Sequence, residues 1–156
     1  MKIEIWWIGK TNEKYLTTGI DLYLKRLKHY NKVSTFTIPD VKSSKESIRV
    51  MTEEGNQVLN RLNHQDFLIL CDENGKTMDS VLLARHMEKW LMQSQYKRIV
   101  FLIGGAWGAS EEVKKRSNFT LSLSKMTFSH QMIRLFLVEQ IYRSFTIIRN
   151  EKYHNV

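Results

Sequence analysis

Short strand-like runs of apolar residues alternate with longer segments of helical spacing along this chain. The strand-like runs are rich in β-branched and aromatic residues and cover residues 2–8, 33–38, 67–71, 99–103 and 119–124. Apolar residues recur every three or four positions in residues 13–30, 44–62, 79–93 and 130–149, which predicts helices. Such alternation is typical of an α/β fold with a mostly parallel sheet flanked by helices, and a flavodoxin-like regulatory domain is one fold of this class.

The chain has 156 residues, which is enough for one domain and too short for two ordinary ones, so we expect a single domain over residues 1–156. Its one cysteine, Cys71, excludes an internal disulfide and a cysteine-based zinc site. No histidine has metal-ligand spacing either, so we expect no bound metal. No run approaches the roughly 20 apolar residues that span a bilayer. We therefore expect a soluble, cytoplasmic protein that does not bind a membrane.

Basic residues exceed acidic ones by eight, and the excess is concentrated towards the C-terminus. Residues 113–156 contain 8 basic and 2 acidic side chains, whereas residues 1–112 contain 16 and 14. Positive charge of this kind raises the local concentration of phosphate backbones and favours RNA as a partner. A solvated basic surface with no partner would have the same composition.

Three predicted loops, residues 71–75, 104–108 and 124–129, follow strands at the sheet edge where α/β proteins bind ligands. Gly104 and Gly105 allow close approach of a ligand or of another chain segment, although an ordinary tight turn has the same pattern. Their spacing matches neither the dinucleotide-binding nor the Walker phosphate-binding motif. After this loop, Ser110 has the pattern of a helix N-cap. The loop at residues 124–129 has mixed polar and apolar side chains that could line a pocket for a partly apolar ligand. Alternatively, it is a surface connection in which His130 caps the last helix.

The last predicted helix is apolar around most of its circumference. One face of a sheet cannot cover so many apolar side chains, so a second surface must, and a symmetric homodimer is its simplest source. Glu139 and Arg143 are four residues apart and would form an intrahelical salt bridge. Alternatively, Arg143 faces a pocket at the dimer interface and stabilises an anion there. Tyr153 and His154 are unusual in a terminus that would otherwise fray.

Several runs of residues, mostly near the C-terminus, resemble a known enzyme family. They are LSLSKMTFSHQMIR at 121–134, EQIYRSF at 139–145, Tyr153-His154, and IGGAWG at 103–108. They resemble the large-subunit ribosomal RNA methyltransferase H family, whose members are small SPOUT methyltransferases. The resemblance covers essentially the whole chain and implies an α/β fold with a C-terminal trefoil knot, a homodimer, and S-adenosylmethionine as cofactor. It also implies methylation of N3 of a pseudouridine in the helix 69 loop of 23S rRNA, within the assembled ribosome.

The resemblance also implies roles for individual residues. The cofactor would contact Leu70, Cys71, Gly104, Gly105, Leu123, Ser124, Lys125, Met126, Thr127 and Phe128. The catalytic residues would be Glu139, Arg143, Tyr153 and His154, with Arg143 stabilising an anion and Tyr153 or His154 positioning the base or relaying a proton. Trp107, Ser129 and Asn155 depart from the family's usual residues. Two alternatives stay open: a non-catalytic RNA-binding relative, and an enzyme that methylates another RNA such as tRNA.

Overall fold

The five strands of the described chain lie parallel in one sheet. The computed structural model describes residues 1–42 and 45–155, and its strands are β1 (Lys2–Ile8), β2 (Val33–Ile38), β3 (Asp66–Thr77), β4 (Arg98–Ile103) and β5 (Phe119–Ser122). Their order across the sheet is β2-β1-β4-β3-β5. The helices are α1 (Lys14–Leu27), α2 (Ser47–Arg61), α3 (Ser80–Leu91), α4 (Glu111–Arg116) and α5 (Met132–Ile148). The predicted parallel α/β fold is confirmed, and the C-terminal knot stays a prediction.

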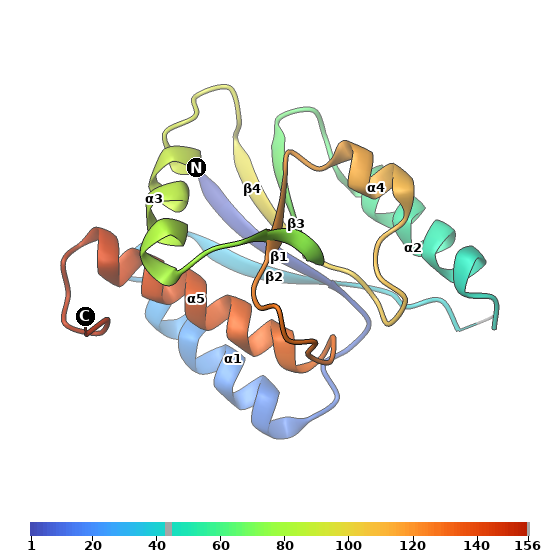
Figure 1. The fold of residues 1–156 in the computed structure, drawn as a ribbon, viewed down its shortest axis with the longest axis horizontal. Coiled ribbons are helices and arrows are strands. Elements are labelled where there is room, and N and C mark those ends of the chain that lie inside the picture. Colours follow the sequence, from blue (N-terminus) through green and yellow to red (C-terminus); the bar gives the residue numbers. More distant parts are fainter. Residues whose placement is uncertain (43–44, 156) are drawn as a thin grey trace.

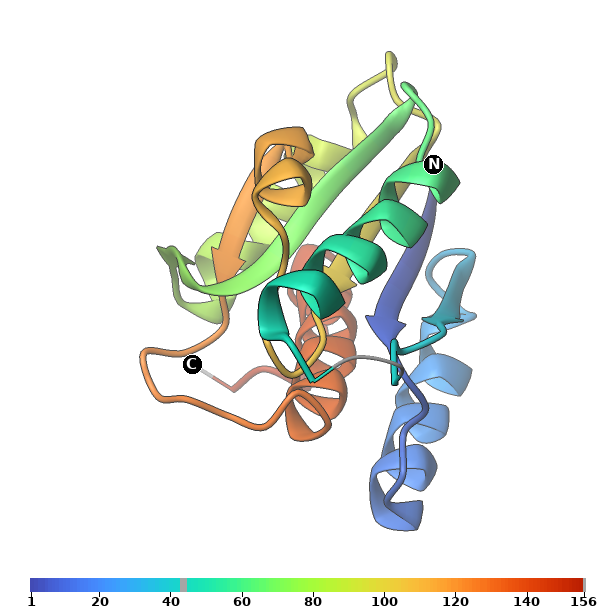
Figure 2. The same ribbon diagram turned by 90° about the vertical axis from the view of Figure 1, so that its right-hand side faces the viewer.

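Helices cover both faces of the sheet. Figures 1 and 2 show α1, α3 and α5 on one face and α2 and α4 on the other. Side chains in a strand point alternately to the two faces, and in β1 both sets are apolar. Ile5 and Trp7 join the core beneath α1, α3 and α5, while Trp6 and Ile8 join the core beneath α2 and α4. Within the described ranges, no helix is long and apolar enough to cross a membrane.

The last helix, α5, lies between α1 and α3 (Figure 1). The sequence predicts that a partner subunit covers the apolar side chains of this last helix. In the structure, α1 and α3 cover many of them. Tyr23 of α1 and Tyr30, in the turn after α1, pack against Tyr142 of α5, with ring centroids 5.6 and 5.9 Å from that of Tyr142. Phe136, by contrast, is 37% exposed. The homodimer therefore stays a prediction, and α5 leaves a smaller surface for it than the sequence suggested.

Strand β3 is longer than predicted. The turn expected at residues 72–75 is instead a bulge inside β3, because Cys71 pairs with Leu121 of β5 and Lys76 pairs with the same residue again. Gly75 is needed in this bulge, since a Cβ atom there would lie 2.7 Å from the backbone carbonyl carbon of Leu121. The bulge thus lies directly against the backbone of β5.

The other boundaries differ only slightly from the predicted ones. β5 ends at Ser122 rather than at residue 124, and the Ser122 hydroxyl donates to the carbonyl of Ser124 in the turn that follows, at 2.9 Å. Residue 44, the predicted start of the second helix, lies outside the described residues, and α2 begins at Ser47. Ser110 is confirmed as the N-cap of α4, since its hydroxyl accepts from the backbone N–H of Val113 at 3.4 Å.

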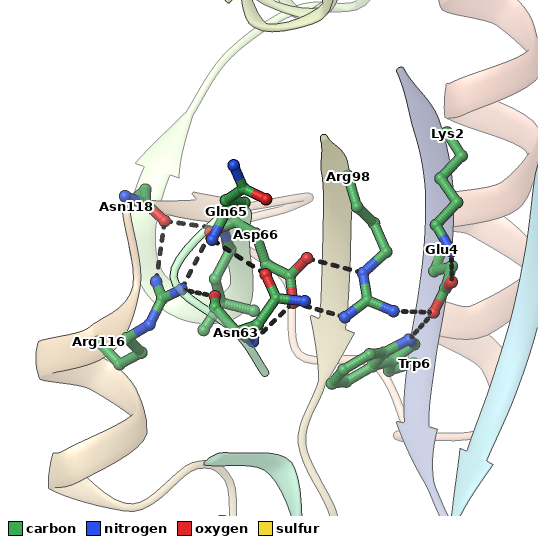
Figure 3. A network of polar contacts seen from close by, with 10 residues as sticks. Lys2, Glu4, Trp6, Asn63, Gln65, Asp66, Arg98, Arg116 and Asn118 are labelled. Carbon is green, nitrogen blue, oxygen red and sulfur yellow. Dashed lines mark hydrogen bonds and ion pairs between the residues drawn. The ribbon is translucent and has the colours of Figure 1, made fainter. Parts of the chain in front are cut away.

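A buried ion-pair network joins three strands near their amino ends (Figure 3). Arg98 of β4 lies between Asp66 of β3 and Glu4 of β1: its Nε donates to Asp66 Oδ1 at 2.8 Å and its Nη1 to Glu4 Oε2 at 3.0 Å. The indole N–H of Trp6 donates to the same Glu4 oxygen at 2.8 Å. Asp66 is only 1% exposed and Arg98 9%. These charges are tolerated in the core because each has an opposite partner.

We expect the fold to lose stability in acid because of Glu4. Burial, the largest single effect, would raise the pKa of Glu4, but hydrogen bonds from Trp6, Lys2 and Arg98 together hold that pKa below its usual value. The ionised carboxylate contributes its full stabilisation above the unfolded-state pKa of about 4.3, and the contribution is lost as the pH falls through the lower folded-state pKa. Urea unfolding across that range measures the loss. Glu4→Gln should be less stable at neutral pH and show a flatter dependence in acid, and an unchanged slope would contradict the assignment.

Candidate active site

A cleft of about 500 Å³ opens at the carboxyl ends of β3, β4 and β5. We call it the glycine-loop cleft, and its walls come mainly from residues 71–74, 103–109, 121–124 and 126–130. Most of the predicted cofactor residues line it: Cys71, Gly104, Gly105, Leu123, Ser124, Met126, Thr127 and Phe128. Leu70 is fully buried beneath α2 and α4, and Lys125 is exposed, so neither side chain lines the cleft. A cleft of this size suits a small-molecule cofactor.

The glycines of this cleft allow its loop to turn back on itself. The backbone N–H of Gly108 donates to the carbonyl of Gly105 at 3.0 Å, and Gly108 has a φ of +85°, in the region that favours glycine. A Cβ atom on Gly104 would lie 2.9 Å from the carbonyl carbon of Gly108. Trp107, at the tip of the loop, is 60% exposed. The close approach predicted for Gly104 is therefore made by the chain itself.

Serine hydroxyls shape the loop that forms the opposite wall. The Ser124 hydroxyl accepts from the backbone N–H of Met126 at 2.9 Å, and that of Ser129 accepts from the N–H of Met132 at 3.1 Å. Ser129 therefore supplies the hydroxyl at the start of α5, and the expectation that His130 caps this helix is wrong. Phe128 packs edge-on against Phe136 of α5, with ring centroids 4.9 Å apart.

A buried arginine fixes the start of α5 beneath the cleft. Arg134 is fully buried, and its guanidinium donates to the carbonyls of Ile8 and Gly9 at 2.7 and 2.9 Å and to the hydroxyl of Thr11 at 2.9 Å. Burial lowers its pKa to about 10, so the group stays charged at neutral pH. Arg134 thereby holds the loop after β1 against the first turn of α5.

The predicted catalytic residues Glu139, Arg143, Tyr153 and His154 form one cluster, which we call the tail cluster. Arg143 Nε donates to Glu139 Oε1 at 3.1 Å, which confirms the predicted salt bridge. The Tyr153 hydroxyl donates to the same oxygen at 2.9 Å. Arg143 Nη1 lies 3.1 Å from His154 Nδ1. Because a guanidinium only donates, Nδ1 is the acceptor here and the ring proton of His154 is on Nε2.

Two tyrosines, Tyr23 of α1 and Tyr30 in the turn after α1, hold the tail in place, and sequence reasoning missed both. The hydroxyl of Tyr23 lies 3.2 Å from that of Tyr153, and the hydroxyl of Tyr30 donates to the Glu151 carboxylate. Tyr23 and Tyr30 are seven residues apart, a spacing that follows one side of the helix predicted over residues 13–30, and this was the available signal. The C-terminal segment is therefore ordered by contacts to α1 and to the turn after it, more than a hundred residues earlier in the chain.

The glycine-loop cleft lies at the start of α5, and the tail cluster lies towards its end. Ile133 lines the cleft, and Arg143 follows ten residues later, about 15 Å along the helix axis. Between them lies a second cleft of about 450 Å³, which includes Glu139 and shares residues 121–124 with the first. The other members of the tail cluster line neither cleft. Within a single chain, therefore, most of the predicted catalytic residues lie away from the predicted cofactor residues.

The chain matches a family model described as "Predicted SPOUT methyltransferase" over residues 1–154. It is 48% identical over 157 residues to "Ribosomal RNA large subunit methyltransferase H" of Flavobacterium johnsoniae, an alignment that covers 99% of each chain. The protein of the same name from Christiangramia forsetii is 46% identical over 157 residues, again with 99% of each chain covered. The chain belongs to the ribosomal RNA large subunit methyltransferase H family.

A solved structure supports the fold of this methyltransferase H family member. "The structure of a probable methylase family protein from Haemophilus influenzae Rd KW20" aligns with a TM-score of 0.53 and 15% identity, over 99% of this chain and 70% of that one. At this identity the likeness concerns the fold alone.

Within residues 1–42 and 45–155, no group of three or more His, Cys, Asp or Glu side chains lies together in a way that would hold a metal ion.

Proposed function

We propose that this methyltransferase H family member transfers a methyl group from S-adenosylmethionine to N3 of pseudouridine 1915 in 23S rRNA, on the assembled ribosome in the cytoplasm. The observation that carries the proposal is the glycine-loop cleft, because the run of residues that resembles the family forms its wall. The names of the similar proteins, which specify large-subunit ribosomal RNA, support the substrate class. So does the basic C-terminal third of the chain, which suits a phosphate backbone.

The glycine-loop cleft fits the cofactor in size and in chemistry. Leu123 and Phe128 offer apolar surface for an adenine ring, while Ser124 and the backbone of residues 104–108 offer polar groups beside it. Bound there, S-adenosylmethionine would supply a methyl group on a sulfonium, which is already an electrophile. The chain's part is to hold the cofactor and to prepare the nucleophile.

The tail cluster suits the stabilisation of an anion. N3 of a pseudouridine becomes a nucleophile when it loses its proton to a solvent water molecule, and the negative charge then spreads over the imide. Arg143 is cationic, and its pKa is raised above the usual value chiefly by its hydrogen bond to Glu139. The Nε2–H of His154 supplies a second donor, because Nδ1 is occupied by Arg143. Both groups would therefore stabilise the imide anion.

Tyr153 and Glu139 position these groups. Burial, together with hydrogen bonds to Tyr23 and Glu139, raises the pKa of Tyr153, so its hydroxyl stays protonated at neutral pH. We therefore assign Tyr153 as a hydrogen-bond donor and not as the base. Glu139 accepts from both Arg143 and Tyr153 and so fixes the guanidinium relative to the tail.

A homodimer would bring the two groups of residues together. We propose that the tail cluster of one protomer faces the glycine-loop cleft of its partner across a twofold axis, so that each site is built from both chains. The exposed ring of Phe136 and the neighbouring half-buried side chains of α5 would lie in the contact. In this arrangement the tail cluster would lie beside a glycine-loop cleft, whereas within a single chain the two are about 15 Å apart along α5.

A methyl-transfer assay on ribosomes tests the proposed function. We expect labelled methyl to enter 23S rRNA of ribosomes that contain the pseudouridine, and much less to enter ribosomes that carry uridine at that position. Mass mapping of the product would place the methyl group on the modified base. Binding of ribosomes without any binding of S-adenosylmethionine in calorimetry would instead indicate a non-catalytic RNA-binding relative, and methylation of tRNA alone would indicate another target.

A further inference from the structure

A third space, a polar cavity of about 350 Å³, adjoins the glycine-loop cleft. We call it the polar cavity. Its lining combines the acidic side chains Asp40 and Glu54 with the basic side chains Lys10 and Lys42. It shares residues 105–107 and His130 with the glycine-loop cleft, so the two spaces adjoin each other at these residues.

Glu54 of α2 distinguishes the polar cavity from an ordinary surface hollow. The residue is only 6% exposed. Its Oε1 accepts from the backbone N–H of Val41 at 3.2 Å. Within residues 1–42 and 45–155, no donor lies within hydrogen-bond distance of its Oε2, and this oxygen is not sealed off from the cavity. Because this oxygen faces the cavity and no protein donor occupies it, it is available to the donor group of a ligand.

The glycine loop lies directly against this carboxylate. A Cβ atom on Gly105 would lie 2.6 Å from Glu54 Oε2, so a larger residue there would displace the carboxylate from its present position. The pKa of Glu54 is raised, chiefly by burial and to a smaller extent by the charge of Asp40, against the lowering effect of the Val41 hydrogen bond. A cation placed between the two carboxylates would relieve both effects.

We propose that the polar cavity binds the amino-acid end of S-adenosylmethionine, with the α-ammonium on Glu54 and Asp40 and the α-carboxylate facing Lys10 and Lys42. This inference rests on the proposed function and deepens it. A zwitterion matches a lining that carries both signs of charge, whereas a phosphate group would be repelled by Glu54. A ligand whose nucleoside end occupies the glycine-loop cleft would reach the cavity past residues 105–107.

Isothermal calorimetry with two related ligands tests the assignment. Glu54→Gln keeps the size of the side chain and the acceptor for Val41 but removes the charge. We expect the variant to bind S-adenosylhomocysteine at least about tenfold more weakly than the wild type does. Both proteins should bind 5′-methylthioadenosine equally, because that compound lacks the amino-acid end. Glu53→Gln changes a half-buried neighbour on the same helix that pairs with Arg49; it is the matched control and should leave both affinities unchanged.

The two ligands separate the possible results. Equal weakening of both would overturn the inference, because Glu54 would then only support the shape of the cleft. Unchanged binding of both would overturn it too. If the wild type binds neither compound, the cofactor of the proposed function fails as well. Should Glu54→Gln not fold in a thermal melt, the same comparison with Asp40→Asn decides, with a smaller selective loss of S-adenosylhomocysteine binding expected.

Discussion

Replacing Arg143 with alanine should lower kcat for methyl transfer to ribosomes by about 100- to 1,000-fold. The guanidinium supplies the fixed positive charge of the tail cluster and orients His154 through Nη1. The affinity for S-adenosylmethionine should stay within about twofold of the wild type, because Arg143 does not line the glycine-loop cleft. Single-turnover kinetics and calorimetry measure the two quantities separately.

Two further variants make this result specific. Arg143→Lys keeps the charge but not the planar fork that reaches Glu139 and His154 together, so it should restore little of the rate. Arg85→Ala removes an exposed arginine from α3 and should leave kcat near the wild-type value. Equal loss of turnover and of cofactor affinity in Arg143→Ala would remove the role that we assign to Arg143.

The largest loss of stability is expected for Arg98→Met. The variant would leave Asp66 and Glu4 in the core without their guanidinium partner, and breaking a buried pair in this way costs about 3–5 kcal/mol. That is a large part of the roughly 5–15 kcal/mol by which a domain is stable. Urea unfolding followed by circular dichroism would measure it as a lower midpoint with an unchanged slope.

A surface pair provides the comparison for Arg98. Arg49→Met removes the partner of Glu53 on the exposed side of α2, where such a pair contributes at most about 1 kcal/mol. If the two variants lost similar amounts of stability, the buried network around Arg98 would contribute no more to the stability of the fold than a surface ion pair does.

The order of the elements could be predicted because local pattern and tertiary burial agree in most of the chain. In β1, apolar residues at successive positions indicate cover on both faces, and helices do lie on both. The bulge of β3 could not be predicted in the same way. Asp72, Asn74 and Gly75 are typical turn residues, yet pairing with β5 keeps this segment in the sheet.

The site could be predicted only from the runs of residues that resemble the methyltransferase H family. Leu70 and Cys71 are neighbours in one strand, so their side chains point to opposite faces, and only Cys71 lines the cleft. Tyr23 and Tyr30 carry no motif, and their part in holding the tail depends on α1 lying beside α5. Glu54 is equally unmarked, since its position beneath Gly105 exists only in the folded chain.

The strand order has a consequence for the nascent chain. The N-terminal strand β1 lies inside the sheet, and one of its two neighbours, β4, begins only at Arg98. The helix that covers this region, α5, is the last to be synthesised. β1 can pair with β2 early, but we expect the chain to complete its sheet and the cover over it only when translation is nearly complete, and to expose apolar strands that chaperones recognise until then.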